Sequence, residues 1–319
     1  MQVPEREKVF TNHGRWHPLW RLTAFSAVLL AIAVLQLAVA GPVAYAIYQR
    51  TGQVDAGTIM AALFDSPGAL VVYAWAALAI AIVGTCYFTV RLDRQPAGAV
   101  GLWPHRGWQR EAAAGLGLGI ALIAAVFAIL LAAGLARVRP SPAGPVPALV
   151  IGIAVLLPLA TMEEVLFRGY TLRNLAQWLG PWWGLAVSAV LFSLGHFANP
   201  QPNPLALANV GLAGVLMGYA YLRSGSLWLA CGLHFAWNFA QGTLFGMPVS
   251  GLGIPGLIHT ELPQPYWVTG GPFGPEGSIV ATVALLGGLA YLRWRYRAGE
   301  RSRMAELPVG VEEHPPGGE

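Results

Sequence analysis

The sequence predicts an all-α fold, a polytopic membrane bundle of about eight transmembrane helices. Of its 319 residues, 55% are hydrophobic and 11% are charged, whereas a soluble globular protein carries roughly 25% charged residues. The mean hydropathy is +0.55. Long apolar runs are spread evenly along the chain, and they lack the alternation that the strands of a membrane β-barrel would show. One bundle of helices therefore fits better than two soluble domains.

Each expected span is a run of about 20 apolar residues, the length of helix that crosses a bilayer core. The first run follows a basic lead-in and passes through "AVAG" (38–41), which resembles a signal-peptidase site. Because the run continues well beyond this point, we expect an uncleaved first span. The eight expected spans are residues 22–48, 67–90, 112–136, 147–167, 181–198, 205–222, 226–246 and 277–293.

Local features add detail to individual spans. Glycine-rich stretches in the third and sixth spans, "GLGLGIAL" (115–122) and "GLAGVLMG" (211–218), predict close helix packing. In the fourth span, Pro158 is expected to kink or restart the helix just before two glutamates. A turn beginning at Gly180 joins the fourth span to the fifth, so these two are expected to be antiparallel. The Gly- and Pro-rich segment 247–276 is expected to be a long extracytoplasmic loop.

Arginine placement predicts the orientation of the bundle, because loops rich in Lys and Arg stay in the cytoplasm. Positive residues precede the first span, lie between the second and third, follow the fourth and the sixth, and follow the last. We therefore expect a multi-pass protein of the cell membrane with both termini in the cytoplasm. The formal net charge of +4 is spread over these membrane-flanking segments. The expected partners are thus the lipid bilayer and a membrane substrate, and not a nucleic acid.

The expected division of the chain has three parts. Residues 1–21 form a cytoplasmic N-terminal segment. Residues 22–298 form the transmembrane bundle, with a functional core at about 147–246. Residues 299–319, rich in Pro, Gly and Glu, are expected to form a disordered cytoplasmic tail. The two cysteines fall inside spans and give no disulfide framework.

Few titratable side chains lie inside the expected spans. A charge at the centre of a membrane costs at least about 2.5–3.5 kcal/mol on insertion scales, so such charges are rare and usually functional. Of the 15 acidic residues, Glu163 and Glu164 are the two well inside an apolar run, whereas Glu276 sits at a span edge. Of the seven histidines, His196 and His234 are the two within spans. This small set is the first indication of a functional site.

Helical spacing groups these side chains. Glu163 lies 17 residues before Gly180 and His196 lies 16 after it, so an antiparallel pair of helices would place them at one depth. Glu164 and Arg168 are four residues apart and share a helix face, where the arginine can hold the acid in a bidentate salt bridge. Glu163 is rotated by about 100° from Glu164, and it is freer to face a cavity and take a proton.

Three short motifs carry these residues. "EEVLFR" (163–168), "FSLGH" (192–196) and "HFAWN" (234–238) fit the patterns EExxxR, FxxxH and HxxxN, in that order. The chain thus resembles the CPBP family of intramembrane proteases, also called the Abi family, which contains the type II CAAX prenyl endopeptidases. "FRGY" and "SGSLW" next to these motifs also look like that family, and the likeness extends over about 150–245.

The resemblance implies a membrane-embedded, glutamate-dependent endopeptidase. It implies that Glu163 and His196 activate a water molecule, and that His234 and Asn238 stabilise the oxyanion. The Glu164–Arg168 pair is implied to support the site. The residue types agree with these roles, because peptide hydrolysis needs a positioned base. Each N–H donor directed at the developing oxyanion is worth about 3–4 kcal/mol of barrier lowering.

Two alternatives stay open. No cofactor is favoured, but Glu163, His196 and His234 could instead ligate one Zn²⁺, with a fourth position for water. The sequence lacks the HExxH helix that would present two ligands on one face. The second alternative is a non-catalytic membrane scaffold or a transporter, in which the polar side chains form interhelical hydrogen bonds. A transporter usually shows repeated halves, and the sequence shows none.

Overall fold

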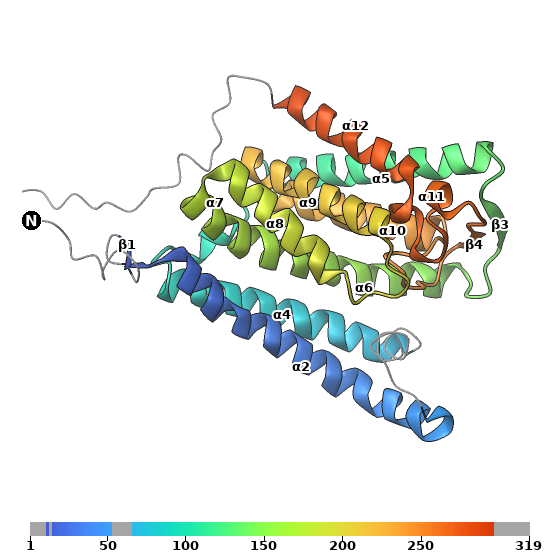
Figure 1. Cartoon of the computed structure of the whole chain (residues 1–319), viewed down its shortest axis with the longest axis horizontal. Coiled ribbons are helices and arrows are strands. Elements are labelled where there is room, and N and C mark those ends of the chain that lie inside the picture. Colours follow the sequence, from blue (N-terminus) through green and yellow to red (C-terminus); the bar gives the residue numbers. More distant parts are fainter. Residues whose placement is uncertain (1–10, 13–14, 53–65, 297–319) are drawn as a thin grey trace, which may run out of the picture.

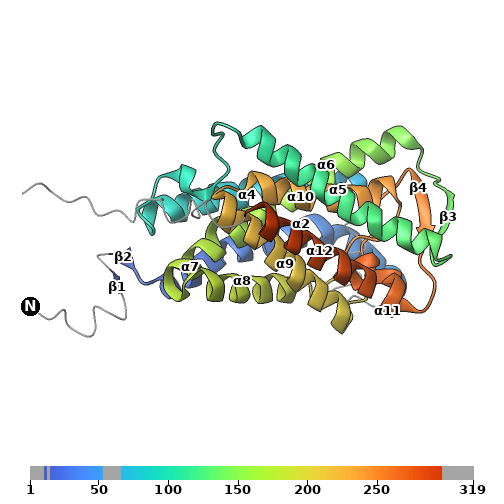
Figure 2. The same cartoon turned by 90° about the horizontal axis from the view of Figure 1, so that it is seen from above.

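The computed structural model describes residues 11–12, 15–52 and 66–296 of the chain. Its long helices run broadly along the longest axis of the molecule (Figures 1 and 2). Five of the described α-helices begin with a proline, whose missing N–H needs no partner there and whose fixed φ suits a helix start. They are α2 (Pro18–Thr51), α4 (Pro67–Arg91), α6 (Pro145–Glu164), α8 (Pro181–Gly195) and α9 (Pro204–Ser224).

The other helices complete an all-α bundle, and the predicted fold class is confirmed. The last long helix is capped by Ser278, whose Oγ accepts a hydrogen bond from the Ala281 N–H at 3.0 Å. Both cysteines are free. The remaining α-helices are α5 (Trp108–Ala132), α7 (Arg173–Leu179), α10 (Trp228–Phe239), α11 (Tyr266–Thr269) and α12 (Ile279–Arg295).

The predicted number of eight spans is not confirmed. Every predicted run contains a helix, but within the described residues five helices are long and apolar enough to cross a membrane. The shorter helices α8, α10 and α12 have 15, 12 and 17 residues. The fifth run was predicted to continue to residue 198, yet α8 ends at Gly195 because the chain turns there before Pro204 starts the next helix. Apolar composition therefore overstates the length of the helices that end at the centre of the bundle.

The fourth predicted span, 147–167, belongs to a longer continuous helix over 145–179. It runs through Pro158 as α6, widens into the π-helical segment η2 (Val165–Leu172) and continues as α7. A second π-helical segment, η3 (Ala240–Leu244), extends α10. Segments of this kind are rare and concentrate at functional sites. Both follow directly on the helices that carry the predicted site residues.

Close helix packing, predicted for the glycine-rich stretches, is confirmed. A Cβ atom on Gly119 of α5 would lie 2.4 Å from the carbonyl oxygen of Leu233 in α10. In α9, a Cβ atom on Gly214 would lie 3.1 Å from the Cα atom of Ala189 in α8. These contacts leave no room for a side chain, so backbone meets backbone and the position of α10, which carries His234, is fixed.

A buried ion-pair cluster ties α2 to the rest of the bundle. Asp93, just beyond the end of α4, lies 3.1 Å from the guanidinium of Arg21 in α2 and also pairs with Arg173 in α7. The hydroxyl of Tyr170 donates to the same carboxylate at 3.3 Å. Away from this cluster, α2 diverges from α6 and α8 in the view of Figure 1.

The segment before α12 folds over the opposite end of the bundle. Its strand β4 (Ile258–Glu261) pairs in antiparallel fashion with β3 (Arg137–Pro140), which connects α5 to α6. The short turns η4 (Gly271–Phe273) and η5 (Pro275–Gly277) then lead into α12. Figure 1 shows this cap at the right-hand end of the molecule. Two further elements are η1 (Ala97–Val100), after α4, and a two-stranded hairpin of β1 (Thr11–Asn12) and β2 (Arg15–Trp16).

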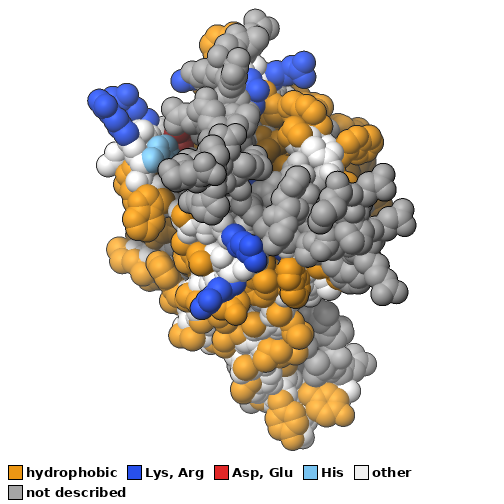
Figure 3. Space-filling model, turned by 90° about the vertical axis from the view of Figure 1, so that its left-hand side faces the viewer, with side chains coloured by type: hydrophobic (Ala, Val, Ile, Leu, Met, Phe, Trp, Pro, Cys, Tyr) orange, Lys and Arg blue, Asp and Glu red, His pale blue; other side chains and the backbone are white. Residues whose placement is uncertain are grey.

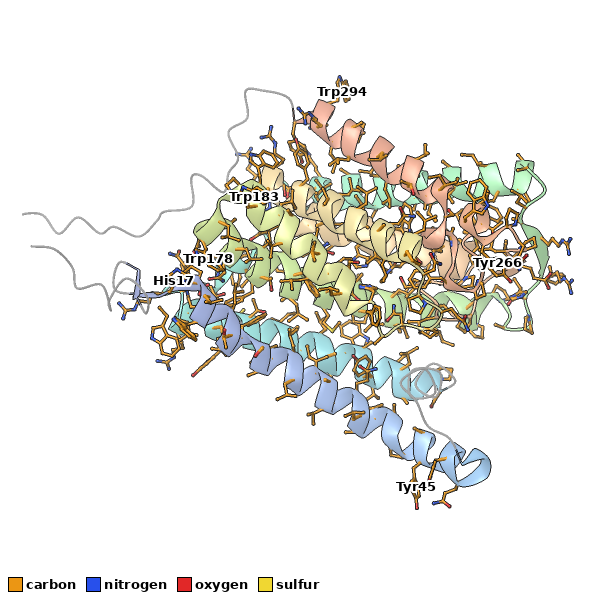
Figure 4. All side chains as sticks on the ribbon, viewed as in Figure 1. His17, Tyr45, Trp178, Trp183, Tyr266 and Trp294 are labelled. Carbon is orange, nitrogen blue, oxygen red and sulfur yellow. The ribbon has the colours of Figure 1, made fainter. Side chains whose placement is uncertain are left out.

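The left-hand end of Figure 1 carries basic and aromatic side chains. Figure 3, which views this end, shows Lys and Arg side chains among a largely hydrophobic surface. Figure 4 places Trp178 and Trp183 toward the same end, and tryptophan is typical of membrane–water interfaces. The predicted tail 299–319 and residues 1–10 of the predicted N-terminal segment lie outside the described residues.

Candidate active site

The two adjacent glutamates end α6, directly before the π-helical segment η2. Because they are neighbours on one helix, their side chains point in different directions. Glu164 is fully buried, whereas the side chain of Glu163 keeps 24% of its surface exposed. The sequence predicted that one acid would be enclosed and that the other would face a cavity. The exposures of Glu164 and Glu163 agree with this prediction.

Glu164 is bound by one arginine and one histidine. Its Oε1 atom lies 2.8 Å from Nη1 of Arg168 and 2.8 Å from Nδ1 of His234. The predicted bidentate pair is not formed, because the other terminal nitrogen of Arg168 donates to the carbonyl oxygen of Gly214 at 3.3 Å. The guanidinium also lies 4.3 Å from the centre of the Phe192 ring, a cation–π distance. Glu164 therefore joins α6 to α10 and orients His234, and Arg168 extends this contact to α9.

Glu163 lies between the two histidines. Its Oε2 atom is 3.8 Å from Nε2 of His196 and 3.8 Å from Nε2 of His234. Oε2 has no hydrogen-bond partner among the described residues. The antiparallel pairing of the fourth and fifth predicted spans, and the equal depth expected for Glu163 and His196, are thus observed.

His196 stands at the end of α8, where it is the first residue beyond the helix. Its Nδ1 atom lies 2.9 Å from the carbonyl oxygen of Phe192. A carbonyl oxygen can only accept, so Nδ1 carries the proton and Nε2 is the free acceptor in the neutral ring. This hydrogen bond turns the acceptor nitrogen of His196 toward Glu163.

His234 and Asn238 lie one turn apart in α10. The imidazole of His234 is buried and is bound through Nδ1 to Glu164, so Nε2 is the nitrogen that reaches Glu163. The carboxamide of Asn238 lines the same cavity. Among the described residues it forms no hydrogen bond, so its N–H groups are free to bind a ligand.

A cavity of about 380 Å³ joins these groups. Its walls are mostly apolar, and they come from α2, α4, α6, η2, α8, α9, α10 and α12 and from the segment before α12. No Lys or Arg lies among the described residues that line it, whereas two carboxylates do. The polar lining side chains are Gln36, Tyr73, Glu163, His196, Asn199, Asn209, His234, Asn238, Ser250 and Glu276.

Glu276 is the carboxylate of this cavity that the sequence argument missed. It lies in η5, and its carboxylate accepts hydrogen bonds from Nε2 of Gln241 at 2.9 Å and from the backbone N–H of Ser250 at 2.6 Å. The carbonyl of Ser250 in turn accepts from Nδ2 of Asn199, three residues after His196, at 3.1 Å. Its position at the edge of an apolar run was a visible signal, but the folding of the preceding loop onto the cavity has no local pattern.

The zinc alternative would use Glu163, His196 and His234, whose side chains meet at this cavity. Within the described residues no group of three His, Cys, Asp or Glu side chains has an arrangement that could hold a metal ion. The two glutamates also differ in what they bind, because the carboxylate of Glu164 is already hydrogen-bonded to Nδ1 of His234.

The fold and the site together define a class of protein: a polytopic membrane bundle whose titratable side chains meet in one cavity between apolar helices. Residues 145–240 match the family model described as type II CAAX prenyl endopeptidase Rce1-like. This segment is just under a third of the chain, and it contains all of the predicted site residues. The match over this segment supports the resemblance to the CPBP family of membrane proteases that the motifs predicted. Searches of curated proteins and of solved structures found no match to the chain.

Proposed function

We propose that the protein is an intramembrane endopeptidase that hydrolyses a peptide bond of a membrane-associated peptide or protein. The observation that carries this proposal is the position of the Glu163 carboxylate, 3.8 Å from Nε2 of His196 and 3.8 Å from Nε2 of His234. A carboxylate held beside imidazole groups in a cavity has what a general base for water requires. The family match of residues 145–240 supports the same reaction class.

Water is activated between Glu163 and His196. The separation of 3.8 Å between Oε2 and Nε2 is too long for a direct hydrogen bond and suits a water molecule that donates one proton to each atom. The oxygen lone pairs of that water then point away from both acceptors, toward a substrate carbonyl carbon. As the new C–O bond forms, Glu163 takes the proton that the water loses.

His234 and Asn238 stabilise the negative charge that develops on the carbonyl oxygen. Nδ1 of His234 already donates to Glu164, so Nε2 donates when the ring is doubly protonated. The amide of Asn238 supplies a second donor, and each donor of this kind is worth about 3–4 kcal/mol in the transition state.

The reaction is completed by transfer of one proton. When the tetrahedral intermediate collapses, the C–N bond breaks and the leaving nitrogen takes the proton held by Glu163. The products are one new carboxyl terminus and one new amino terminus, and Glu163 returns to its ionised form. Because the site lies among apolar helices, the scissile bond belongs to a substrate segment that can enter the membrane.

The test of this proposal is Glu163→Gln, which keeps the side-chain shape and removes the base. We expect peptide cleavage to fall by about 10²–10⁴-fold while the protein stays inserted and folded. Comparative peptidomics of membranes from cells with the wild-type and the Glu163→Gln protein would measure the loss and identify substrates together. The matched control is Glu261→Gln, at the far end of the bundle in β4, which should cleave like the wild type.

A zinc-dependent form of the same hydrolysis is tested by metal removal. Treatment with a chelator, followed by metal analysis and the cleavage assay, should leave activity unchanged if Glu163 and His196 activate water without a metal. Loss of activity that returns with Zn²⁺ alone would assign the reaction to the metal. If the protein is a scaffold or a transporter, we expect a third outcome. The Glu163→Gln protein then folds, and its cells contain the same peptides as cells with the wild type.

We also propose that the protein lies in the cell membrane with both termini in the cytoplasm. The arginines at the left-hand end of Figure 1 support this orientation. The proposal places the cap formed by β3, β4 and η5 outside the cytoplasm.

A further inference from the structure

A second hollow in the molecule lies outside the catalytic cavity. It is a groove of about 1040 Å³ over α9, between α8 and α12, and it shares no lining residue with the catalytic cavity. A volume of this size exceeds what a small inorganic ion fills and is in the range of sites for larger organic ligands. Its lining residues are Trp182, Leu185, Val215, Tyr219, Arg223, Leu286, Leu289, Ala290, Arg293, Trp294 and Tyr296.

The groove changes from apolar to cationic along its length. Its floor follows one face of α9, where Val215, Tyr219 and Arg223 are successive members four residues apart. Its wall on α12 passes in the same direction from apolar side chains to Arg293. Each stripe covers about 10–12 Å at the helical rise of 1.5 Å per residue. Arg223 donates to the carbonyl oxygen of Tyr296, three residues after Arg293, so both arginines lie at the same end.

Two arginines line the cationic end of the groove, Arg223 and Arg293. Among the described residues neither Arg223 nor Arg293 forms an ion pair with a carboxylate. The guanidinium of Arg223 is held in place instead, by a hydrogen bond to the carbonyl oxygen of Tyr296 and by the ring of Tyr219, whose centre lies 5.8 Å away. A positioned cation without a counter-ion favours an anionic ligand.

Aromatic side chains mark the rim as the level of the membrane interface. Trp182 and Trp294 are 61% and 58% exposed, and the ring of Trp182 stacks on that of Tyr219 with centres 6.3 Å apart. Tryptophan prefers the level of lipid headgroups. Figure 4 shows Trp183, the neighbour of Trp182 in α8, toward the left-hand end that carries the basic residues, and Trp294 at the top of the view near the end of α12. The apolar part of the groove therefore lies at the depth of acyl chains and its cationic end at the depth of headgroups.

We propose that this groove is a binding site for an anionic phospholipid, with its acyl chain along α9 and its phosphate between Arg223 and Arg293. The occupant is amphiphilic because the groove is, and it is anionic because the two guanidinium groups need a counter-ion. Basic pockets between transmembrane helices bind lipid headgroups in this way. The inference does not depend on the proposed hydrolysis, since the groove and the catalytic cavity share no lining residue.

The test uses the full chain in detergent, titrated with phosphatidylglycerol and with phosphatidylcholine and followed by native mass spectrometry. We expect phosphatidylglycerol to bind more tightly. Arg293→Gln and Arg223→Gln should each weaken its binding about fivefold and leave phosphatidylcholine unaffected. The control is Arg110→Gln, an exposed arginine at the start of α5 and outside the groove, which should bind both lipids like the wild type.

A second variant separates the acyl part from the headgroup part. Ala290→Phe places a ring in the apolar half of the groove and should weaken both lipids to a similar extent. Equal affinity for the two lipids in the wild type would overturn the proposal, as would an effect of the groove arginines no larger than that of Arg110→Gln. Displacement of phosphatidylglycerol by millimolar inorganic phosphate would assign the arginines to a free anion and would also overturn it.

Discussion

At the scale of single residues, the main feature is the different environment of two adjacent glutamates. Glu164 binds Arg168 and His234 and has no accessible surface. Glu163 lies against the same histidine from the cavity side and keeps an oxygen without a partner among the described residues. Glu164 therefore holds the side chains of the site in position, and the carboxylate of Glu163 remains available to react.

Loss of the Glu164 charge should destabilise the fold. In Glu164→Gln the guanidinium of Arg168, which is 1% exposed, would be a buried cation without a counter-ion. Breaking a buried pair in this way costs about 3–5 kcal/mol. The measurement is the free energy of unfolding in detergent, and we expect a loss in this range together with loss of cleavage.

The matched control is the exposed pair of Arg139 and Glu261, 3.3 Å apart with side chains 63% and 38% exposed. Arg139→Gln should change the unfolding free energy by at most about 1 kcal/mol. If both variants lose the same small amount, Glu164 does not act as the buried counter-ion of Arg168.

Glu276 should make stability depend on pH. Burial raises the pKa of its carboxyl above the usual value near 4.5, against the opposing effect of the hydrogen bonds from Gln241 and Ser250. The folded protein then binds this proton more tightly than the unfolded chain does. Its contribution is most favourable below the unfolded pKa, and it is lost as pH rises through that value toward the raised one.

The measurement is thermal unfolding in detergent between about pH 4 and pH 7. The wild type should lose stability with rising pH over part of this interval, and Glu276→Gln should lose less because its amide cannot ionise. Glu261→Gln, an exposed carboxylate in β4, should keep the wild-type profile. Identical profiles for the wild type and Glu276→Gln would contradict the prediction.

At the scale of elements, the sequence predicts where helices lie better than how they are wound. Apolar runs located every long helix, since burial in a membrane demands about 20 apolar residues. They did not locate the π-helical segments after Glu164 and Phe239, because the extra residue per turn depends on packing against other helices. They also missed the end of α8 at Gly195, where apolar residues continue but the chain turns to present His196.

The packing of α5 against α10 should tolerate no side chain at Gly119. In Gly119→Val the added Cβ would lie 2.4 Å from the Leu233 carbonyl oxygen, so the helices must separate. Overpacking of this kind typically costs about 1–3 kcal/mol. We expect a lower unfolding free energy and weaker cleavage, because α10 carries His234 and Asn238.

Gly117 supplies the control for this prediction. It lies two residues away on the same helix, and a Cβ atom there would have no neighbour within 4 Å. Gly117→Val should therefore be close to the wild type in both measurements. Equal losses in the two variants would show that valine lowers the intrinsic helix stability and that the contact with α10 is not responsible.

At the scale of the whole molecule, the site is assembled from parts with different predictability. Glu163, His196, His234 and Asn238 come from three helices, and the motifs identified them because titratable groups are rare in apolar runs. Glu276 was not identified, since it reaches the cavity only through the fold of the loop before α12. The lipid groove was also invisible to the sequence, because its walls come from three helices that are individually ordinary.

The orientation of the whole bundle gives the last prediction. With Cys86 and Cys231 replaced by alanine, single cysteines at Gln109 and at Pro142 lie at opposite ends, because Gln109 begins α5 and Pro142 follows β3. Arginines flank the helices at the Gln109 end, so this end should stay in the cytoplasm. A membrane-impermeant thiol reagent should label Pro142→Cys in intact cells and Gln109→Cys only after permeabilisation. The reverse pattern would invert the bundle and move the cap that carries Glu276 to the cytoplasmic side, so that substrates would reach the cavity from the other face.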